Sequence, residues 1–298
     1  MPKLPSILVE DVSKSRETVK QLLEIEKRSS QMAERILTEA KDRLMQVGFT
    51  AKAVEAVFRK IERGVARDIC GWAETSKKAD GIIISSRGRS RLEAFFTGEI
   101  ANKVLEYVKV CPVWMVKGRV KSKNILLAID HSENAMRAVD HAGFMLSGTD
   151  ANVTVFHSKR DLRRFVPAEV LHEFPGVQKF WQRKAGDVVA PYMKKAREML
   201  IQAGLAENKI SVKMVDGSRS AARDIFKEAE ENTIGTIVLG RKGCSAVEDY
   251  SMGSITKKVL DPTRIRRIDG GFSFIPHRFL TGGFLASLHQ KEILLSFF

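Results

Sequence analysis

The sequence predicts an α/β protein made of two doubly wound parallel-sheet domains in tandem, both of them incomplete. The prediction comes from short apolar runs that alternate with helix-like segments, and from an internal repeat. The letters "ARDI" occur at 66–69 and again at 222–225, and "GIIISSRG" at 81–88 aligns with "TIVLGRKG" at 236–243. The two matches are offset by 156 and 155 residues, so a single gap reconciles them.

The second repeat shows the alternation most completely. Its apolar runs suit buried parallel strands, and the segments between them carry helix signals such as Ser132 at an N-cap and Gly204 at a C-cap. The expected strands are 124–129, 152–157, 210–215 and 235–240. The expected helices are 132–146, 187–203, 220–231 and a last one that begins at Ser254. Strands that alternate with helices imply right-handed crossovers and a parallel sheet.

The first repeat has only the later elements of this series. We expect a long helix that ends near Gly48, and only the short run 6–10 precedes it. At least one strand and one helix of the second repeat therefore have no counterpart. The other expected elements are strands at 53–58, 81–85 and 112–116, a helix at 65–78, and a helix that ends near Lys109.

The predicted domain organisation follows from the limits of the two repeats. It consists of a degenerate domain at 1–118, a linker at 119–123, a second domain at 124–260 and a tail at 261–298. The tail aligns with neither repeat and offers no recognisable fifth strand. Four glycines interrupt any regular period in it, so we expect the tail to be poorly ordered. They are Gly270, Gly271, Gly282 and Gly283. The alternatives are that the phenylalanines and leucines of the tail cover the sheet edge left open by the missing fifth strand, or that they contact a membrane surface.

Composition narrows the class of protein. The net charge of +14 would favour acidic partners, but the basic residues are scattered among Glu on helix-like segments, so nucleic acid is not an expected partner. Three cysteines without a CxxC pair argue against a disulfide framework or zinc site and fit a reducing cytoplasm. No apolar run reaches the ~18 residues of a membrane span.

A glycine-containing loop follows the last predicted strand of the second repeat. In "VLGRKGCSAVEDYSMGSITKKVL" (238–260), Gly240 and Gly243 would let backbone amides approach phosphate, and Gly253 with Ser254 would open a helix whose N–H groups favour an anion. The spacing matches neither GxxxxGK[ST] nor GxGxxG. Asp130 should meet this loop at the carboxyl edge of the sheet, or it could simply cap the helix that follows.

At these residues the sequence resembles the universal stress protein family in its tandem form. The resemblance rests on "ILLAIDHSENAMRAVDHA" (125–142), "VTVFHS" (153–158), "VDGSRSAARDI" (215–225) and the pattern G-x2-G-x9-G-S that begins at Gly240. It implies Rossmann-like domains similar to adenine-nucleotide alpha hydrolases. It also implies that the second domain binds ATP, with Mg²⁺ at the phosphates.

The resemblance also implies roles for individual residues. Asp130 would contact the ribose or adenine side, Ala128 would lie next to the base, and Ser158 would offer backbone contacts to adenine. Arg241 would neutralise phosphate charge, and Thr256 would reach the same phosphates. The candidate set is Ala128, Asp130, Ser158, Gly240, Arg241, Gly243, Gly253, Ser254, Ile255 and Thr256, with no metal ligand and no catalytic residue assigned.

The first repeat departs from the family pattern at the same loop. It reads Ser85-x2-Gly88-x9-Gly98-Glu99, which puts a carboxylate where the family offers a hydroxyl, so we expect no nucleotide there. Family members usually associate through their fifth strand, so we expect a homodimer or an intramolecular domain pair. The expected function is a cytoplasmic, nucleotide-responsive regulator of stress survival with at most slow ATP hydrolysis.

Two other functions stay open on the sequence alone. One is a nucleotide-independent interaction module of the same fold, and the other is an enzyme that cleaves ATP between its α and β phosphates. No histidine lies in a recognisable triad, so His131, His141, His157 and His172 are expected to be structural or surface residues. Cys244 is expected to be an incidental loop thiol.

Overall fold

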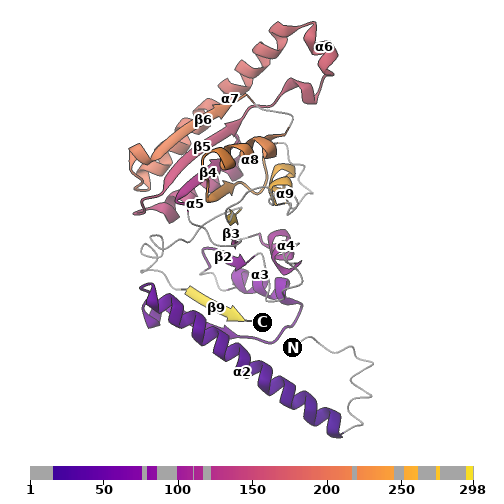
Figure 1. The fold of residues 1–298 in the computed structure, drawn as a ribbon, viewed down its shortest axis with the longest axis vertical. Helices are drawn as coiled ribbons and strands as arrows, with labels where there is room; N and C mark the ends of the chain where they lie inside the picture. Colours follow the sequence, from indigo (N-terminus) through magenta and orange to yellow (C-terminus); the bar gives the residue numbers. More distant parts are fainter. Residues whose placement is uncertain are drawn as a thin grey trace. The chain divides into compact units, whose positions relative to one another are not determined.

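The structure is a computed structural model of the chain (Figure 1). It describes residues 16–75, 79–85, 99–109, 111–116, 122–216, 220–244 and 252–260, and the backbone of 273–275 and 293–297. The chain divides into two compact units. The first comprises Met1–Gly71 with Leu285–Phe298, and the second comprises Trp72–Phe284.

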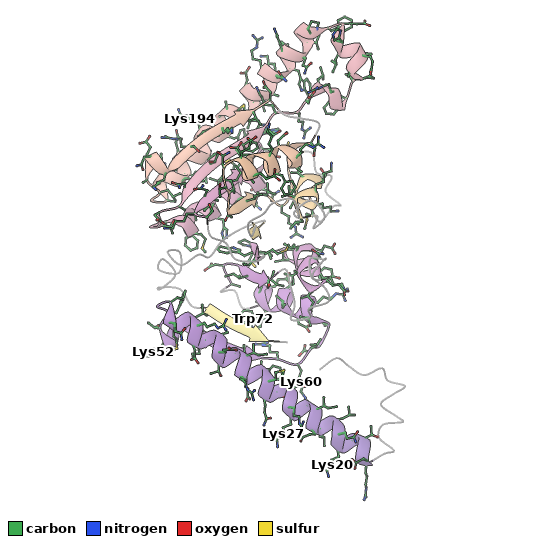
Figure 2. The ribbon with its side chains drawn as sticks, viewed as in Figure 1. Lys20, Lys27, Lys52, Lys60, Trp72 and Lys194 are labelled. Carbon is green, nitrogen blue, oxygen red and sulfur yellow. The ribbon has the colours of Figure 1, made fainter. Side chains whose placement is uncertain are left out.

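The first unit is built on a long helix and a two-stranded sheet. Helix α2 (Arg16–Gln46) ends just before Gly48, whose φ of +105° turns the chain. Strand β1 (Val54–Phe58) pairs in parallel with β9 (Ile293–Phe297), and α2 contacts both strands. Lys20 and Lys27 lie along the exposed surface of α2 (Figure 2). These two cations follow the prediction that basic side chains lie on solvated helix faces.

The second unit contains a seven-stranded sheet to which both repeats contribute. Its strand order is β2-β3-β8-β7-β4-β5-β6, and every neighbouring pair is parallel except β3 with β8, where Met115 lies opposite Phe274. The strands are β2 (Ile82–Ser85), β3 (Val113–Val116), β4 (Asn124–Ala128), β5 (Asn152–Ser158), β6 (Ile210–Val215), β7 (Thr236–Leu239) and β8 (Ser273–Ile275). The predicted α/β class with parallel sheets is confirmed.

The central strands form the core of this unit. Leu126, Leu127 and Ile237 on β4 and β7 have no exposed surface, as expected for parallel strands covered on both faces. The helices of the second repeat are α5 (Glu133–Leu146), α6 (Ala168–His172), α7 (Pro175–Gln202), α8 (Ala221–Glu231) and α9 (Ser254–Leu260). The first repeat supplies α3 (Val65–Thr75) and α4 (Glu99–Tyr107). Short 3₁₀ turns are η1 (Ala51–Ala53), η3 (Leu162–Arg164) and η4 (Glu207–Lys209).

Helix α7 differs from its sequence-based prediction. It begins at Pro175 rather than near Asp187, with the proline in the first turn, where its missing N–H costs no hydrogen bond. Its N-terminal half buries no side chain, because its buried residues run from Val189 onwards. The prediction relied on apolar residues facing a core, and this half of the helix has none.

The tail differs from the prediction at two places. β8 lies beside β7, in the position of the fifth strand that could not be recognised in the sequence, and β9 pairs with β1. β8 has only three residues, "SFI", which is too short for a recognisable period. Poor order of the tail stays a prediction for 261–272, 276–292 and 298, which lie outside the described residues.

Candidate functional site

The candidate site is assembled from the ends of neighbouring parallel strands. β4 and β7 pair with Ala128 opposite Leu239, so the residues that follow them, Asp130 and Gly240, leave the sheet at the same edge. β5 lies on the other side of β4 with Phe156 opposite Ala128, and therefore brings Ser158 to this edge as well. Three predicted site segments thus converge where ligands bind open parallel sheets.

Asp130 joins the β4–α5 turn to the glycine loop. Its Oδ1 accepts a hydrogen bond from the Ser132 backbone N–H (3.0 Å), and its Oδ2 accepts one from the Cys244 backbone N–H (3.0 Å). Burial raises the pKa of Asp130, but hydrogen bonds from Ser132 and Cys244 outweigh it and hold the pKa below its ordinary value. The carboxylate is therefore charged, and each of its oxygens accepts a hydrogen bond from a backbone N–H group.

The loop glycines are needed for close approach. A Cβ at Gly243 would lie 2.5 Å from Asp130 Oδ2, and a Cβ at Gly240 would lie 2.9 Å from the backbone nitrogen of Ala135 at the start of α5. Gly253 is packed against the loop backbone, where a Cβ would lie 3.3 Å from the Arg241 carbonyl oxygen. None of these three glycines has a positive φ. Glycine is therefore required at these positions because a side chain would not fit, and not because the backbone is left-handed.

Hydroxyl groups also hold the loop in place. Ser132 caps α5 by accepting a hydrogen bond from Ala135 N–H (3.1 Å), and its hydroxyl donates to the Lys242 carbonyl (3.4 Å). The buried Thr256 hydroxyl donates to the Gly240 carbonyl (3.0 Å). In this structure Thr256 therefore fixes the start of the loop, and its contact with phosphate stays a prediction.

Arg241 reaches an element of the first repeat. Its guanidinium donates a hydrogen bond to the backbone carbonyl of Glu106 (2.8 Å), near the C-terminal end of α4. The last carbonyls of a helix carry partial negative charge, which favours a cation at this place. The sequence assigned Arg241 to phosphate and gave no sign of this contact, because α4 lies more than a hundred residues away along the chain.

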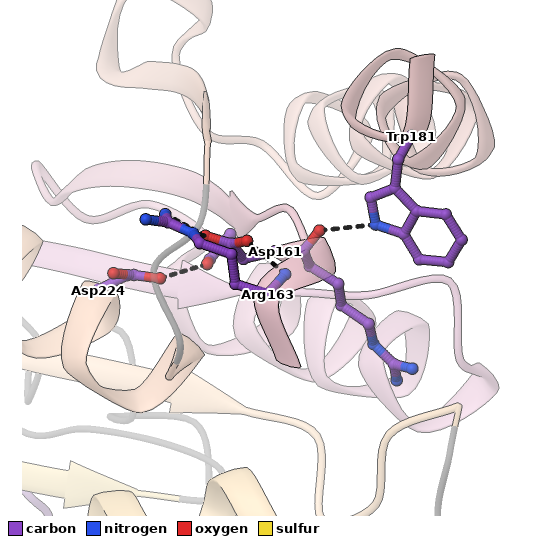
Figure 3. A network of polar contacts seen from close by, with 6 residues as sticks. Asp161, Arg163, Trp181 and Asp224 are labelled. Atoms are coloured by element: carbon purple, nitrogen blue, oxygen red, sulfur yellow. Dashed lines mark hydrogen bonds and ion pairs between the residues drawn. The ribbon is translucent and has the colours of Figure 1, made fainter. Parts of the chain in front are cut away.

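A second group of polar contacts involves Asp161, Arg163, Trp181 and Asp224 (Figure 3). The Ser158 hydroxyl donates to Asp224 Oδ2 in the first turn of α8 (2.5 Å), which leaves the backbone of Ser158 for the predicted contact with adenine. Nearby, buried Asp161 caps η3 and pairs with Arg163, while the Trp181 indole N–H donates to the Arg160 carbonyl (2.9 Å). Sequence reasoning missed this network, because its pairs show no distinctive spacing.

His157 has a structural role, as predicted. Its Nδ1 lies 2.7 Å from the Ile129 carbonyl oxygen, a distance that fits an N–H donated by the ring. Burial lowers the pKa of His157, so the neutral ring is favoured. It thereby ties β5 to the turn that carries Asp130.

The first repeat offers a different chemistry at its corresponding loop. Glu99, the first residue of α4, is exposed and pairs with Lys103. Gly88 and Gly98 lie outside the described residues, as do 245–251 of the second loop. The absence of nucleotide from the first repeat therefore stays a prediction.

The described residues contain neither a metal-binding cluster nor a membrane-spanning helix. Within these ranges, no three His, Cys, Asp or Glu side chains gather as a metal site. In the same part of the chain, no helix is both long and apolar enough to cross a bilayer.

Comparison with solved structures finds matches at low identity. A universal stress protein from Archaeoglobus fulgidus DSM 4304 is 20% identical over 87% of this chain and 79% of its own, with a TM-score of 0.48. UspA from Lactobacillus plantarum is 23% identical over 48% of this chain and 92% of its own (TM-score 0.36). A universal stress protein solved in complex with cAMP is 20% identical over 54% of this chain and 100% of its own (TM-score 0.36).

No curated protein matches the sequence. The family model of the universal stress proteins, in contrast, matches twice, over residues 7–117 and 121–264. Together these two segments cover most of the chain. The chain therefore belongs to the universal stress protein family and contains two family segments in tandem.

Proposed function

We propose that the second family segment binds ATP and that the protein is a cytoplasmic, nucleotide-responsive regulator of stress survival. The observation that carries the proposal is the contact between the glycine loop and Asp130 at the carboxyl edge of β4 and β7. Gly243 lies so close to the Asp130 carboxylate that no side chain fits between them. Such a close approach lets the loop backbone face a ligand that sits beyond the strands.

The surroundings fit the parts of a nucleotide. Ala128 at the end of β4 and the backbone of Ser158 at the end of β5 would face the base, and the amides of the loop would face the phosphates. Mg²⁺ usually keeps several waters and binds through phosphate oxygens, so it would be held mainly by the nucleotide.

Arg241 offers a route from the nucleotide to the first repeat. Its hydrogen bond to the Glu106 carbonyl is made to a neutral acceptor. A phosphate would be the stronger acceptor, because it adds a negative charge and can accept two parallel hydrogen bonds from one guanidinium. Binding of ATP would then draw Arg241 away from α4 and change how the two repeats are joined.

Equilibrium titration of the full chain with ATP tests this proposal. We expect Gly243→Val and Asp130→Ala to weaken binding by at least about tenfold, which corresponds to ~1.4 kcal/mol. The matched control is Gly176→Ala on α7, where a Cβ would meet nothing within 4 Å. Equal affinity in wild type, both site variants and the control would rule out this site.

A nucleotide-independent interaction module is the second candidate. It is favoured by the internal bonding of the loop, since Asp130, Ser132 and Thr256 all bond to backbone of their own chain. Mass spectrometry of the denatured protein distinguishes the two functions. Absence of ATP from the purified protein, together with no binding on titration, would favour the interaction module.

A further inference from the structure

The N-terminal half of α7 presents apolar side chains outward. Phe174, Val177, Trp181 and Val188 are 54%, 50%, 36% and 52% exposed. Val177, Trp181, Lys184 and Val188 are spaced by four, three and four residues, which places these four on one face of α7. Phe174 is the N-cap residue and extends the row just before the helix begins. This row is called the outer α7 row below.

The outer α7 row is distinct from the apolar row that packs on the sheet. The buried residues Val189, Met193, Ala196 and Leu200 lie in the C-terminal half of α7, which packs against α5, β5 and β6. Adjacent residues are about 100° apart around a helix, so the step from Val188 to Val189 turns the apolar surface from solvent to core. The α6 end of α7 extends beyond the sheet (Figure 1), so its outer row has room for a partner.

Trp181, the largest side chain of the row, is held in place by contacts within its own chain. The Trp181 indole N–H donates to the Arg160 carbonyl (2.9 Å), and its ring meets Phe165 edge-on with 6.1 Å between ring centroids. A held aromatic side chain loses little conformational entropy on binding.

The charges around the row are balanced, and two of the three acidic residues are separated from the basic ones, whereas Asp187 follows the basic residues. Between Phe165 and Val188 there are three acidic and three basic residues, although the whole chain carries a net charge of +14. Glu169 and Glu173 lie at the α6 end, whereas the three basic residues follow further along α7. Those are Lys179, Arg183 and Lys184. A net charge of zero gives no attraction to an anionic membrane, but this segregation complements itself when two copies run antiparallel.

We propose that the outer α7 row is the contact between two copies of this chain, paired antiparallel about a two-fold axis near Val177. Phe174 of one copy then lies near Trp181 of the other, and Glu173 lies within about one helical turn of Lys184. The fifth-strand edge is already in use within the chain, because β8 pairs with β3. A contact between two such helices is at the small end of interfaces, below ~1,200 Å², so we expect a weak, concentration-dependent dimer.

Sedimentation equilibrium of the full chain at several concentrations tests the contact. Val177→Glu places like charges across the axis and should raise the dimer Kd at least about tenfold. Val177→Lys should do the same, and a mixture of the two variants should restore dimers. Val212→Glu on β6 is the matched control, because Val212 is an exposed valine (46%) on a strand and is not part of the row. The far-UV circular dichroism of all variants should match wild type.

Cross-linking tests the antiparallel orientation. In a Cys244→Ser background, Val177→Cys should form a disulfide-linked dimer on oxidation, because its two copies meet at the axis. Val188→Cys should not, since eleven residues of helix on each side separate its copies by about 33 Å.

Three results would overturn the proposal. The first is a wild-type chain that stays monomeric at every concentration, and the second is a dimer weakened equally by Val177→Glu and Val212→Glu. The third is a monomer that binds phosphatidylserine vesicles and loses them with Val177→Glu, which would assign the row to a lipid surface.

Discussion

Gly243→Ala gives a quantitative test of how the glycine loop is held. The added Cβ would lie 2.5 Å from Asp130 Oδ2, which is closer than real Cβ atoms approach any atom, so the carboxylate must rotate away. Rotation breaks the hydrogen bond from the Cys244 N–H to Asp130. A hydrogen bond to a charged group contributes ~1.5–3 kcal/mol, and the stiffer unfolded chain of an alanine returns ~0.5 kcal/mol. We expect a net loss of about 1–2.5 kcal/mol in local stability.

The assay is amide hydrogen exchange of residues 240–244, which reports local opening free energies. The decisive comparison is a double-mutant cycle with Asp130→Ala. Without the carboxylate there is nothing for the new Cβ to displace, so Gly243→Ala should cost almost nothing in that background. Gly176→Ala serves as the control for a glycine with open space around it. An equal cost in both backgrounds would show that the added Cβ clashes with some group other than the Asp130 carboxylate.

Three further predictions concern the surroundings of the site. Arg241→Ala removes the hydrogen bond to the Glu106 carbonyl and should lower the free energy of unfolding by ~0.5–1.5 kcal/mol. Urea titration measures this free energy, and an unchanged value would contradict the contact. Burial lowers the pKa of His157, so stability should fall as the pH drops below its ordinary value of ~6.5, and His157→Gln should flatten this part of the melting-temperature profile. Truncation after Leu260 removes β8 and exposes the edges of β7 and β3. The truncated protein should therefore have a lower melting temperature and a lower solubility than the full chain. No change in either quantity would exclude a structural role for the tail.

The sequence predicted the strands and most helices of the second unit because their signals are local. β4 and β7 are continuous apolar runs, and Ser132 caps α5 as its position before the helix suggested. The start of α7 was missed for the converse reason. Its first turns are stabilised without a buried apolar side chain, so the period that predicts a core-facing helix is missing there.

The candidate site was only partly accessible to sequence reasoning. Spacing alone brought Asp130 and the loop to the same edge of the sheet, and the structure places Gly243 against that carboxylate. The spacing of residues could not predict the partners of Arg241 or Ser158, because the Glu106 carbonyl and Asp224 reach the site only through the packing of α4 and α8. Contacts between distant segments depend on how helices pack on the sheet, which no spacing rule encodes.

The shared sheet suggests why a repeat with a degenerate loop can be retained. β2 and β3 come from the first repeat, yet they extend the sheet of the second through the pairing of Met115 with Phe274. Without them, β8 would be a three-residue edge strand, and an open edge is a site of aggregation. The first repeat can therefore stabilise the second without binding a nucleotide. Its strands cover the edge of the sheet, and its helix α4 provides the carbonyl that accepts the Arg241 hydrogen bond. The replacement of the first loop glycine by Ser85 and of the serine by Glu99 in the first repeat leaves both of these contributions intact.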